Sequence, residues 1–357
     1  MDKNKRWCIV FFCLVIFMLG GLASVTVIID PFFHYHKPLE QLEYPMKTDY
    51  QLYINNGVLR NFDYDALIIG SSMTENFKTS QLDELFGVHS VKTGFAGNSL
   101  YVFSTNIQTA IDEQEDLSMV ITCLDVTRLR DHKDFMEYDV SKYPTYLYDD
   151  NIFNDVQYVL NKDILLEETY DVIKYTQDGN QSTTFDEYCN WMDESEFGAE
   201  NVLARYQRID KKEATKEAQE AQSVHLQSNV MQNVVDLAKA NPQVEFYIFF
   251  PPYSICWWDY MDRFGAVEWQ IDVIEYTTEL VLECENVHLY AFYEEYDIIC
   301  DLENYRDITH YSESINEQIL IWMANGEHEL TKENYEQYFE DMKTFYMQHD
   351  YDAYFNL

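Results

Sequence analysis

The amino-acid sequence predicts an α/β fold in which helices cover both faces of a parallel sheet, preceded by one transmembrane helix. From about Asp63 onwards, strand-like and helix-like segments alternate, which is typical of βαβ units. The strand-like segments are short and mostly apolar, as expected for strands buried on both faces. Near the N-terminus, the 23 residues from Trp7 to Ile29 carry no charge.

Five segments are predicted to form the strands. Most are rich in β-branched or aromatic residues. They are Asp65–Gly70, Ser90–Thr93, Ser118–Leu124, Val244–Phe250 and Val287–Phe292. Helical segments fill the gaps, as the crossovers between parallel strands require.

Three segments of the C-terminal half are predicted to be amphipathic helices. They are Glu213–Ala240, Trp269–Cys284 and Ser312–Ala324. Pro242 ends the first of them, and Gly326 stands where the C-terminal cap of the third belongs. Residues 327–357 are expected to add a helical extension.

The soluble part is expected to be one domain over residues 63–326, joined to the membrane helix by a connector over residues 30–62. The segment of residues 130–213 interrupts the alternation, because it is rich in Tyr, Asp and Asn and has weak periodicity. We interpret it as an insertion that forms a cap or a substrate-binding subregion. A disordered loop is the alternative.

Residues 1–29 are predicted to form a short cytoplasmic tip and a single-pass membrane anchor. An α-helix needs roughly 20 apolar residues to cross the hydrocarbon core. Lys3, Lys5 and Arg6 precede the apolar run, so the positive-inside rule places the C-terminal domain outside the cytoplasm of a bacterial cell. A cleaved signal peptide is the alternative, but the apolar run continues for six residues past Ala23, which favours a retained anchor.

Charge and composition narrow the choice of partners. The chain has 63 acidic and 24 basic residues, a net charge of −39. This field repels phosphate backbones, so nucleic acid is not an expected partner. The seven cysteines show no clustered Cys/His spacing, so neither a metal site nor a cofactor is expected.

A serine after the first predicted strand is the candidate nucleophile. Ligands of open α/β sheets bind at the carboxyl ends of the strands. There, Gly70, Ser71 and Ser72 form a G-S-S turn. Such a turn can present a hydroxyl close to backbone N–H groups that stabilise an oxyanion. A plain helix cap is the alternative for this pattern taken alone.

Complementary groups follow two other predicted strands. Gly97 can donate its backbone N–H to the same oxyanion, and Asn98 is a further candidate donor. Asp307 and His310 form the only D-x-x-H of the chain. The carboxylate can hold the imidazole while the other ring nitrogen faces the serine.

The order of these motifs matches the blocks of the SGNH/GDSL hydrolase superfamily, which the chain resembles over residues 63–326. The resemblance implies a flavodoxin-like sandwich with Ser72 as nucleophile, His310 as general base and Asp307 as the residue that orients it. It also implies the backbone N–H groups of Ser72 and Gly97 as oxyanion donors. No cofactor is implied.

The G-S-S form and the anchor resemble a membrane-bound branch of this superfamily. That branch includes the D-alanyl transfer protein of lipoteichoic acid D-alanylation and the alginate O-acetylation proteins. Both work with membrane-bound O-acyltransferases, so the resemblance implies such a partner and a cell-envelope polymer as substrate.

The third block departs from the superfamily pattern. It usually places an Asn in a G-x-N-D motif as an oxyanion donor, whereas the matching stretch Thr122–Thr127 contains Asp125 and no Asn. An ionised carboxylate cannot donate a hydrogen bond, and losing one such donor costs about 10²–10³-fold in rate. This favours slow, partner-dependent transfer or a non-catalytic role over fast hydrolysis.

Further residues at strand ends are candidate substrate contacts. They are Asp125, Tyr253, Trp257 and Tyr311. For the aromatic residues, packing under the insertion is the alternative. Arg128 and Arg130 follow the third strand and are suited to an anionic group, with structural ion pairs as the alternative.

Three functions are compatible with these observations. The first is acyl transfer to a hydroxyl of a cell-envelope glycan or teichoic-acid-like polymer. The second is an esterase or deacetylase that uses water instead. The third is a non-catalytic subunit of an acylation complex. The membrane anchor favours transfer, because a secreted scavenging esterase needs no tether.

Overall fold

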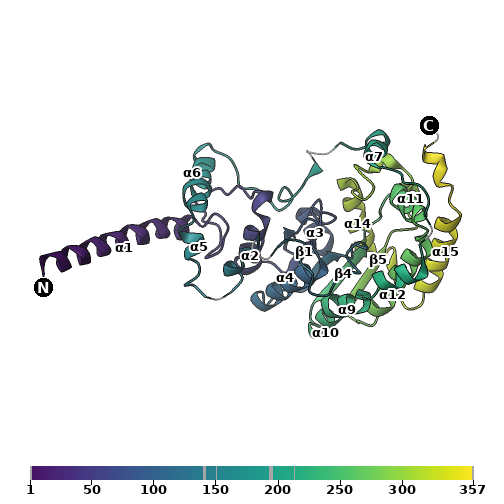
Figure 1. The fold of residues 1–357 in the computed structure, drawn as a ribbon, viewed down its shortest axis with the longest axis horizontal. Coiled ribbons are helices and arrows are strands. Elements are labelled where there is room, and N and C mark those ends of the chain that lie inside the picture. The colour runs from purple at the N-terminus through teal and green to yellow at the C-terminus, as the bar shows by residue number, and fades with distance from the viewer. Residues whose placement is uncertain (1, 140–141, 150, 193–195, 213, 356–357) are drawn as a thin grey trace. The chain divides into compact units, whose positions relative to one another are not determined.

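The protein is an α/β protein with a mixed six-stranded sheet, in the order β2-β1-β3-β4-β5-β6 (Figure 1). A computed structural model describes residues 2–139, 142–149, 151–192, 196–212 and 214–355. The strands are β1 (Ala66–Gly70), β2 (Ser90–Gly94), β3 (Met119–Cys123), β4 (Glu245–Phe250), β5 (Val287–Ala291) and β6 (Glu329–Leu330). The first five strands pair in parallel, and β6 pairs antiparallel with β5.

The five predicted strands are confirmed to within one residue at each end. One expectation is wrong, because the sheet is not purely parallel. The expected helical extension contains α15 (Tyr335–Gln348), and the short strand β6 precedes it. Residues 329 and 330 form β6 opposite Tyr290 and Leu289. A strand of two residues is too short to leave a periodic signal in the sequence.

The chain clusters into two compact units. Unit 1 comprises Met1–Asp63 and Tyr138–Tyr188, and unit 2 comprises Tyr64–Glu137 and Cys189–Leu357. Unit 2 therefore holds the sheet. Unit 1 combines the N-terminal helix and the segment that follows it with the middle of the stretch expected to be an insertion.

Most of the helices belong to unit 2. They are α3 (Thr79–Phe86), α4 (Leu100–Glu113), α7 (Ala199–Arg205), α8 (Lys216–Gln222), α9 (Leu226–Val230), α10 (Asp236–Ala240), α11 (Ile255–Arg263), α12 (Val267–Val281), α13 (Tyr296–Ile299), α14 (Glu313–Asn325) and α15 (Tyr335–Gln348). Short turns of 3₁₀-helix are η7 (Leu302–Asn304) and η8 (Tyr351–Phe355), and η6 (Met231–Val235) is a π-helical turn between α9 and α10. Gly326 caps α14 in the left-handed conformation, with φ 68°, as expected.

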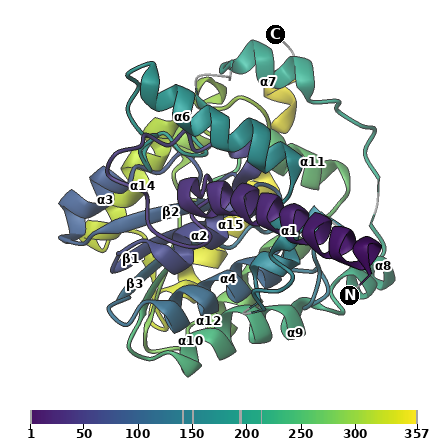
Figure 2. The same cartoon turned by 90° about the vertical axis from the view of Figure 1, so that its left-hand side faces the viewer.

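The helices of unit 2 form two contacting groups. In one group, α4 contacts α9 and η6, α9 contacts α12, and α12 contacts α15. In the other, α3 contacts α14. Figure 2 shows these two groups on different sides of β1 and β3. All five residues of each of β1, β2 and β3 are buried. β1 and β3 are mostly apolar, whereas β2 also buries Ser90, Lys92 and Thr93.

Unit 1 is helical. It contains α1 (Lys3–Ile29), η1 (Thr48–Tyr50), α2 (Gln51–Asn61), η3 (Thr145–Leu147), α5 (Val156–Val159), the π-helical turn η4 (Ile164–Glu168) and α6 (Thr169–Gln177). Among the described residues, α1 is the one helix long and apolar enough to cross a membrane, with a mean hydropathy of 2.7 over its most apolar window. Gly57 of α2 packs against the backbone of the segment after α1, because a Cβ there would lie 2.1 Å from the Phe32 carbonyl oxygen.

Candidate active site

The G-S-S turn follows directly from β1 and is shaped by close packing. A Cβ on Gly70 would lie 2.7 Å from the Thr74 side chain and 3.0 Å from Cys123 Sγ, so only glycine fits. The Thr74 N–H and hydroxyl both donate to the Ser71 carbonyl oxygen, at 2.9 Å each. This tight turn buries Ser71 but leaves Ser72 half-buried and accessible.

Ser72 lies in hydrogen-bond contact with the D-x-x-H histidine. The distance from Ser72 Oγ to His310 Nε2 is 2.8 Å, although 238 residues separate them in sequence. On the other side of the ring, His310 Nδ1 lies 2.8 Å from Asp307 Oδ2. The structure thus brings together all three residues that the motifs predict, in the geometry of a Ser-His-Asp triad.

Several hydrogen bonds hold the Asp307 carboxylate in place as the acceptor for the His310 ring. Its carboxylate also accepts hydrogen bonds from the backbone N–H groups of Thr309 and His310, both at 2.9 Å. Burial acts to raise the pKa of Asp307, but the hydrogen bond and charge of His310, with these N–H groups, hold the pKa below the usual range. An ionised carboxylate at this position keeps the imidazole oriented with Nε2 toward the serine.

The two backbone N–H groups predicted as oxyanion donors, those of Ser72 and Gly97, lie in two loops. Gly97 is exposed, with φ 66°, a conformation that glycine adopts without strain. Among the described residues, neither the Gly97 N–H nor the Ser72 N–H has an acceptor. Arg128 donates to the Gly97 carbonyl and pairs with Glu137 at 2.8 Å. These contacts hold the loop that contains Gly97 in place.

Asn98, the predicted side-chain donor, and Asp125, a predicted substrate contact, lie near these loops in other roles. Asn98 is buried, and its backbone N–H donates to the Phe95 carbonyl at 3.0 Å. Asp125 accepts hydrogen bonds from the Thr127 N–H and hydroxyl, at 2.9 and 2.6 Å. Its carboxylate also interacts with the Tyr253 hydroxyl by a hydrogen bond. Asp125 thus serves as an acceptor that fixes its own loop.

The aromatic residues expected to contact substrate are buried instead. Tyr253 and Tyr311 are each 1% exposed and Trp257 is 4% exposed. The Tyr311 hydroxyl donates to the Met73 carbonyl, next to Ser72. These side chains position the loops around the triad, which corresponds to the packing alternative.

Trp191 is a neighbour of the triad that the motifs did not reveal. Its indole N–H donates to the Ser72 carbonyl at 3.1 Å, and its backbone N–H donates to the Asn76 side chain at 3.1 Å. Its ring meets the His310 ring edge-on, with centroids 5.5 Å apart, and the Arg306 guanidinium lies 4.9 Å from the ring centroid. No motif marks this tryptophan, because it lies in the aperiodic stretch before α7.

A buried lysine and a buried glutamate lie next to the two loops. Glu75 is 3% exposed and Lys92 is 0% exposed, and the Lys92 ammonium donates to the Glu75 and Phe77 carbonyl oxygens, at 2.6 and 2.9 Å. Burial raises the pKa of Glu75 to about 7, although the Lys92 charge and a hydrogen bond from the Ala96 N–H act to lower it. The carboxylate therefore links the serine loop to the residue before Gly97.

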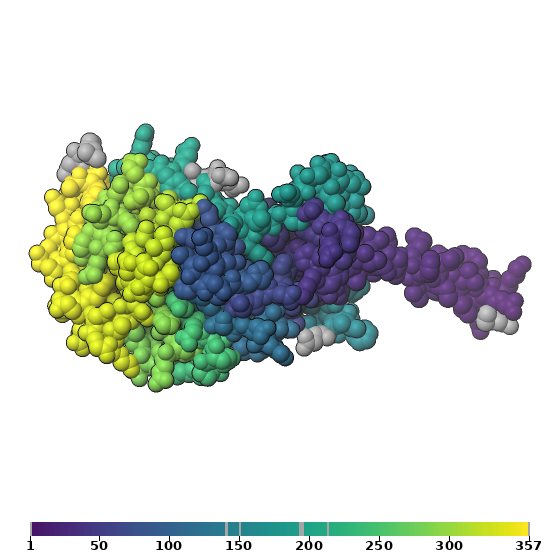
Figure 3. All heavy atoms as spheres, turned by 180° about the vertical axis from the view of Figure 1, so that it is seen from behind, coloured from purple at the N-terminus to yellow at the C-terminus, as the bar shows by residue number. Residues whose placement is uncertain are grey.

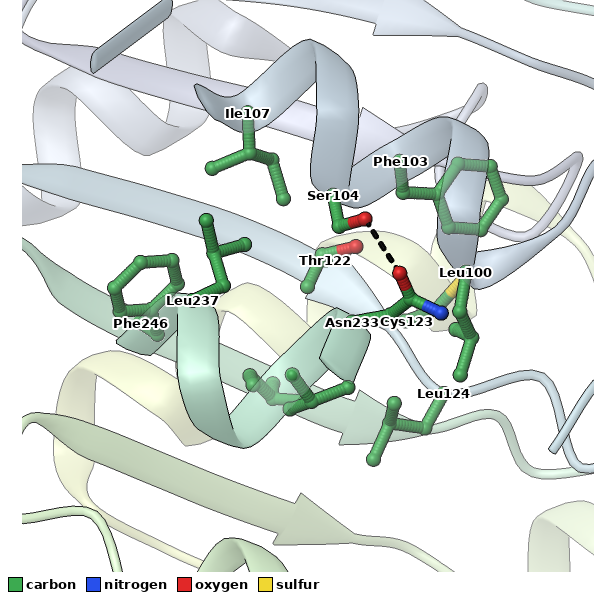
Figure 4. A pocket seen from close by; sticks show the side chains of 12 residues that line it. Leu100, Phe103, Ser104, Ile107, Thr122, Cys123, Leu124, Asn233, Leu237 and Phe246 are labelled. Carbon is green, nitrogen blue, oxygen red and sulfur yellow. Dashed lines mark hydrogen bonds between the residues drawn. The ribbon is translucent and has the colours of Figure 1, made fainter. Parts of the chain in front are cut away.

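A small internal cavity lies elsewhere in unit 2. It has a volume of about 20 Å³ and is lined by residues of α4, η6, β3 and β4, including Ser104 and Asn233, which share a hydrogen bond of 2.9 Å (Figure 4). None of its lining residues belongs to the triad or its loops. It offers room for about one water molecule and is not a substrate site.

The two arginines after β3 have different partners. Arg128 pairs with Asp131 and Glu137, as the ion-pair alternative predicted. Arg130 stacks over the Trp269 ring at 4.3 Å.

Comparisons with known proteins give little for this chain. No family model and no curated protein matches it. A solved structure provisionally named a platelet activating factor, from Streptococcus pneumonia, aligns over 78% of this chain and 91% of its own. Its sequence identity is 12% and its TM-score is 0.35. This likeness is too weak to support an argument, so the inferences about function rest on the geometry of the chain itself.

Proposed function

We propose that this protein is an SGNH-like, serine-dependent acyltransferase that O-acylates a cell-envelope polysaccharide or teichoic-acid-like polymer outside the bacterial cytoplasm. The observation that carries the proposal is the hydrogen-bonded series from Ser72 Oγ through His310 to Asp307. The N-terminal helix, which is long and apolar enough to span a membrane, supports a membrane-anchored enzyme. In this proposal the strands and helices of unit 2 form a flavodoxin-like sandwich.

The first half-reaction makes an acyl-enzyme. Ser72 Oγ attacks the carbonyl carbon of a donor ester or thioester, while His310 Nε2 takes the hydroxyl proton. The Ser72 and Gly97 N–H groups donate to the oxyanion, and Asp307 stabilises the imidazolium. When the tetrahedral intermediate collapses, the bond to the leaving group breaks and His310 returns the proton to that group.

The second half-reaction passes the acyl group on. An acceptor hydroxyl loses its proton to His310 as its oxygen attacks the Ser72 ester. Collapse of the second intermediate forms the new ester and returns the proton to Ser72. If water takes the place of the acceptor, the same residues catalyse hydrolysis, so an SGNH esterase or deacetylase is the alternative.

The donor side of the reaction points to a partner in the membrane. An acyl group used outside the cytoplasm must be delivered across the bilayer. We infer that a membrane-bound O-acyltransferase delivers it. A role as a non-catalytic subunit of such a complex is the third candidate, favoured by the acceptor role of Asp125 where the superfamily has a donor.

Labelling with a fluorophosphonate probe tests for an activated serine. The full-length protein in detergent micelles is treated with the probe beside the Ser72→Ala and His310→Ala variants. We expect labelling of the wild type and its loss in both variants. Ser80→Ala, which removes an exposed hydroxyl of α3, is the control and should label like the wild type.

The outcomes separate the three functions. Folded wild-type protein that does not label alone or with membranes containing its partner contradicts the enzyme proposal and favours the non-catalytic role. If labelling occurs, p-nitrophenyl acetate is used as acyl donor with glycerol as acceptor. Transfer predicts that added glycerol accelerates turnover and yields glycerol acetate, whereas a strict esterase yields acetate alone.

A further inference from the structure

Unit 1 carries a group of exposed apolar side chains around the end of α1. The group lies on the turn before α5, on α5 itself, on η4 and at the start of α6. Its members, here called the apolar collar, are Ile152, Phe153, Val156, Leu166 and Tyr170. Phe153 is 86% exposed and Ile152 is 73% exposed, so these side chains contribute little to the core of the unit.

The concentration of these residues is local. Outside α1, nine large apolar residues are exposed in the described part of the chain, and five of them lie within residues 152–170. Single exposed apolar residues need no explanation, but exposed apolar residues that gather on neighbouring elements indicate an interaction surface, and η4 contacts both α5 and α6. The collar therefore needs a partner that covers it.

The elements that carry the collar also contact α1. Helices α5 and α6 and the turn η4 each pack against α1, and the Thr26 hydroxyl donates to the Val159 carbonyl at 3.0 Å. In Figure 3, teal atoms of this region lie beside the base of the purple helix. The position of the collar along α1 is thus fixed at about Thr26, where the helix first becomes buried.

Helix geometry places this level at the edge of a bilayer. The hydrocarbon core is about 30 Å thick and a helix rises about 1.5 Å per residue, so roughly 20 residues cross it. Counted from Trp7, where the uncharged run begins, this length ends close to Thr26. The collar then lies where the helix leaves the hydrocarbon.

We propose that the apolar collar inserts into the bilayer interface around the exit of α1, so that unit 1 is seated in the lipid as well as tethered by the helix. Apolar side chains of interfacial segments reach roughly 5–10 Å into the boundary between headgroups and acyl chains. This attachment relies on apolar burial and does not require basic residues, which suits a chain with a net charge of −39. It is independent of the reaction at Ser72.

The test places an environment-sensitive NBD fluorophore on single introduced cysteines of the full-length protein in phosphatidylcholine vesicles. The background replaces Cys8 and Cys13, the exposed cysteines of α1, with alanine. Phe153→Cys and Leu166→Cys report on the collar. Phe17→Cys, in the middle of α1, is the reference for lipid, and Asp178→Cys, an exposed position after α6, is the reference for water.

We expect the two collar positions to be quenched by nitroxide-labelled lipid and protected from aqueous iodide. Their iodide quenching constants should be at least about threefold below that of the Asp178→Cys position, as for side chains at the membrane interface. Quenching at Phe17→Cys by the lipid shows in the same sample that the anchor is inserted. Both collar substitutions replace exposed side chains, so folding is not at risk.

Two outcomes would contradict the proposal that the collar enters lipid. If Phe17→Cys is lipid-quenched while the collar positions respond to iodide like Asp178→Cys, the collar does not enter lipid and the proposal is wrong. Protection that appears only when native membranes are fused with the vesicles also overturns it, because the collar would then bind a membrane protein.

Discussion

A buried carboxylate of unit 1 and a half-buried carboxylate of unit 2 each accept several hydrogen bonds, yet their pKa values differ. Asp307 in unit 2 accepts from two backbone N–H groups and from the His310 ring. Asp30 in unit 1 accepts from the Tyr158 hydroxyl at 2.9 Å and from the N–H groups of Tyr35 and His36, at 2.6 and 3.1 Å. By hydrogen bonding alone, the two groups look equivalent.

Their pKa values move in opposite directions. Complete burial raises the pKa of Asp30, because its hydrogen bonds to Tyr35 and Tyr158 do not compensate for desolvation. At Asp307, the hydrogen bond and positive charge of His310 overcome the effect of burial and lower the pKa. A titratable partner, rather than the number of hydrogen bonds, therefore accounts for the opposite pKa shifts of the two carboxylates.

The largest effect is expected for a substitution at Asp307. Replacing Asp307 with Asn should lower the rate of fluorophosphonate labelling roughly 10⁴-fold, because the amide stabilises the wrong tautomer of His310. The rate is measured with purified full-length protein. Asp30→Asn serves as the control and should keep the wild-type rate, and an equal loss in both variants would contradict the distinction.

A pH-dependent effect on stability is expected from Glu75. Its pKa in the folded state is about 7, above the ordinary value of 4.5, so its favourable contribution is present below pH 4.5 and is lost as the pH rises through about 7. This loss is of the order of 3 kcal/mol, at about 1.4 kcal/mol per pKa unit.

Urea unfolding between pH 4 and pH 8 tests this expectation. The difference in free energy of unfolding between Glu75→Gln and the wild type should shift in favour of the variant as the pH rises. A difference that does not change with pH would show that the Lys92 charge keeps Glu75 ionised throughout.

In unit 1, hydrogen bonds of the Tyr158 hydroxyl link the segment after α1 to α5. It donates to Asp30 and accepts from the Phe32 N–H at 3.3 Å. Tyr158→Phe leaves both groups without this partner and should lower the free energy of unfolding of unit 1 by about 1–3 kcal/mol. Hydrogen exchange of the α2 amides measures this loss, and the labelling rate at Ser72 should stay unchanged. Tyr170→Phe, at an exposed position, should have no effect on either.

The smallest effect is expected at Trp191. Trp191→Phe keeps an aromatic ring beside His310 but removes the N–H that donates to the Ser72 carbonyl. Loss of one such hydrogen bond should lower the labelling rate about 5–10-fold. A rate equal to that of the wild type would mean that the turn holds Ser72 without help from the indole.

The sequence predicted the elements whose signals are local. The strands are continuous apolar runs, and the serine turn and D-x-x-H follow such runs directly, so both could be located by pattern. Trp191 and the pairing of residues 138–188 with the N-terminal segment could not, because they depend on contacts between distant residues in stretches without periodicity. The role of Asp125 could not be predicted from the sequence either, because it depends on Tyr253, which lies 128 residues further along the chain.

The hydrogen bond between Asp30 and Tyr158 has a consequence for how the protein is made. Its two residues are separated by 128 positions, and ribosomes add about 5–20 residues per second. The segment after α1 is therefore synthesised about 6–25 seconds before its partner, a period in which all of the first three strands of the other unit are produced. Unit 1 cannot complete its folding first, although it contains the N-terminus, because this hydrogen bond forms only when nearly half of the chain has been synthesised.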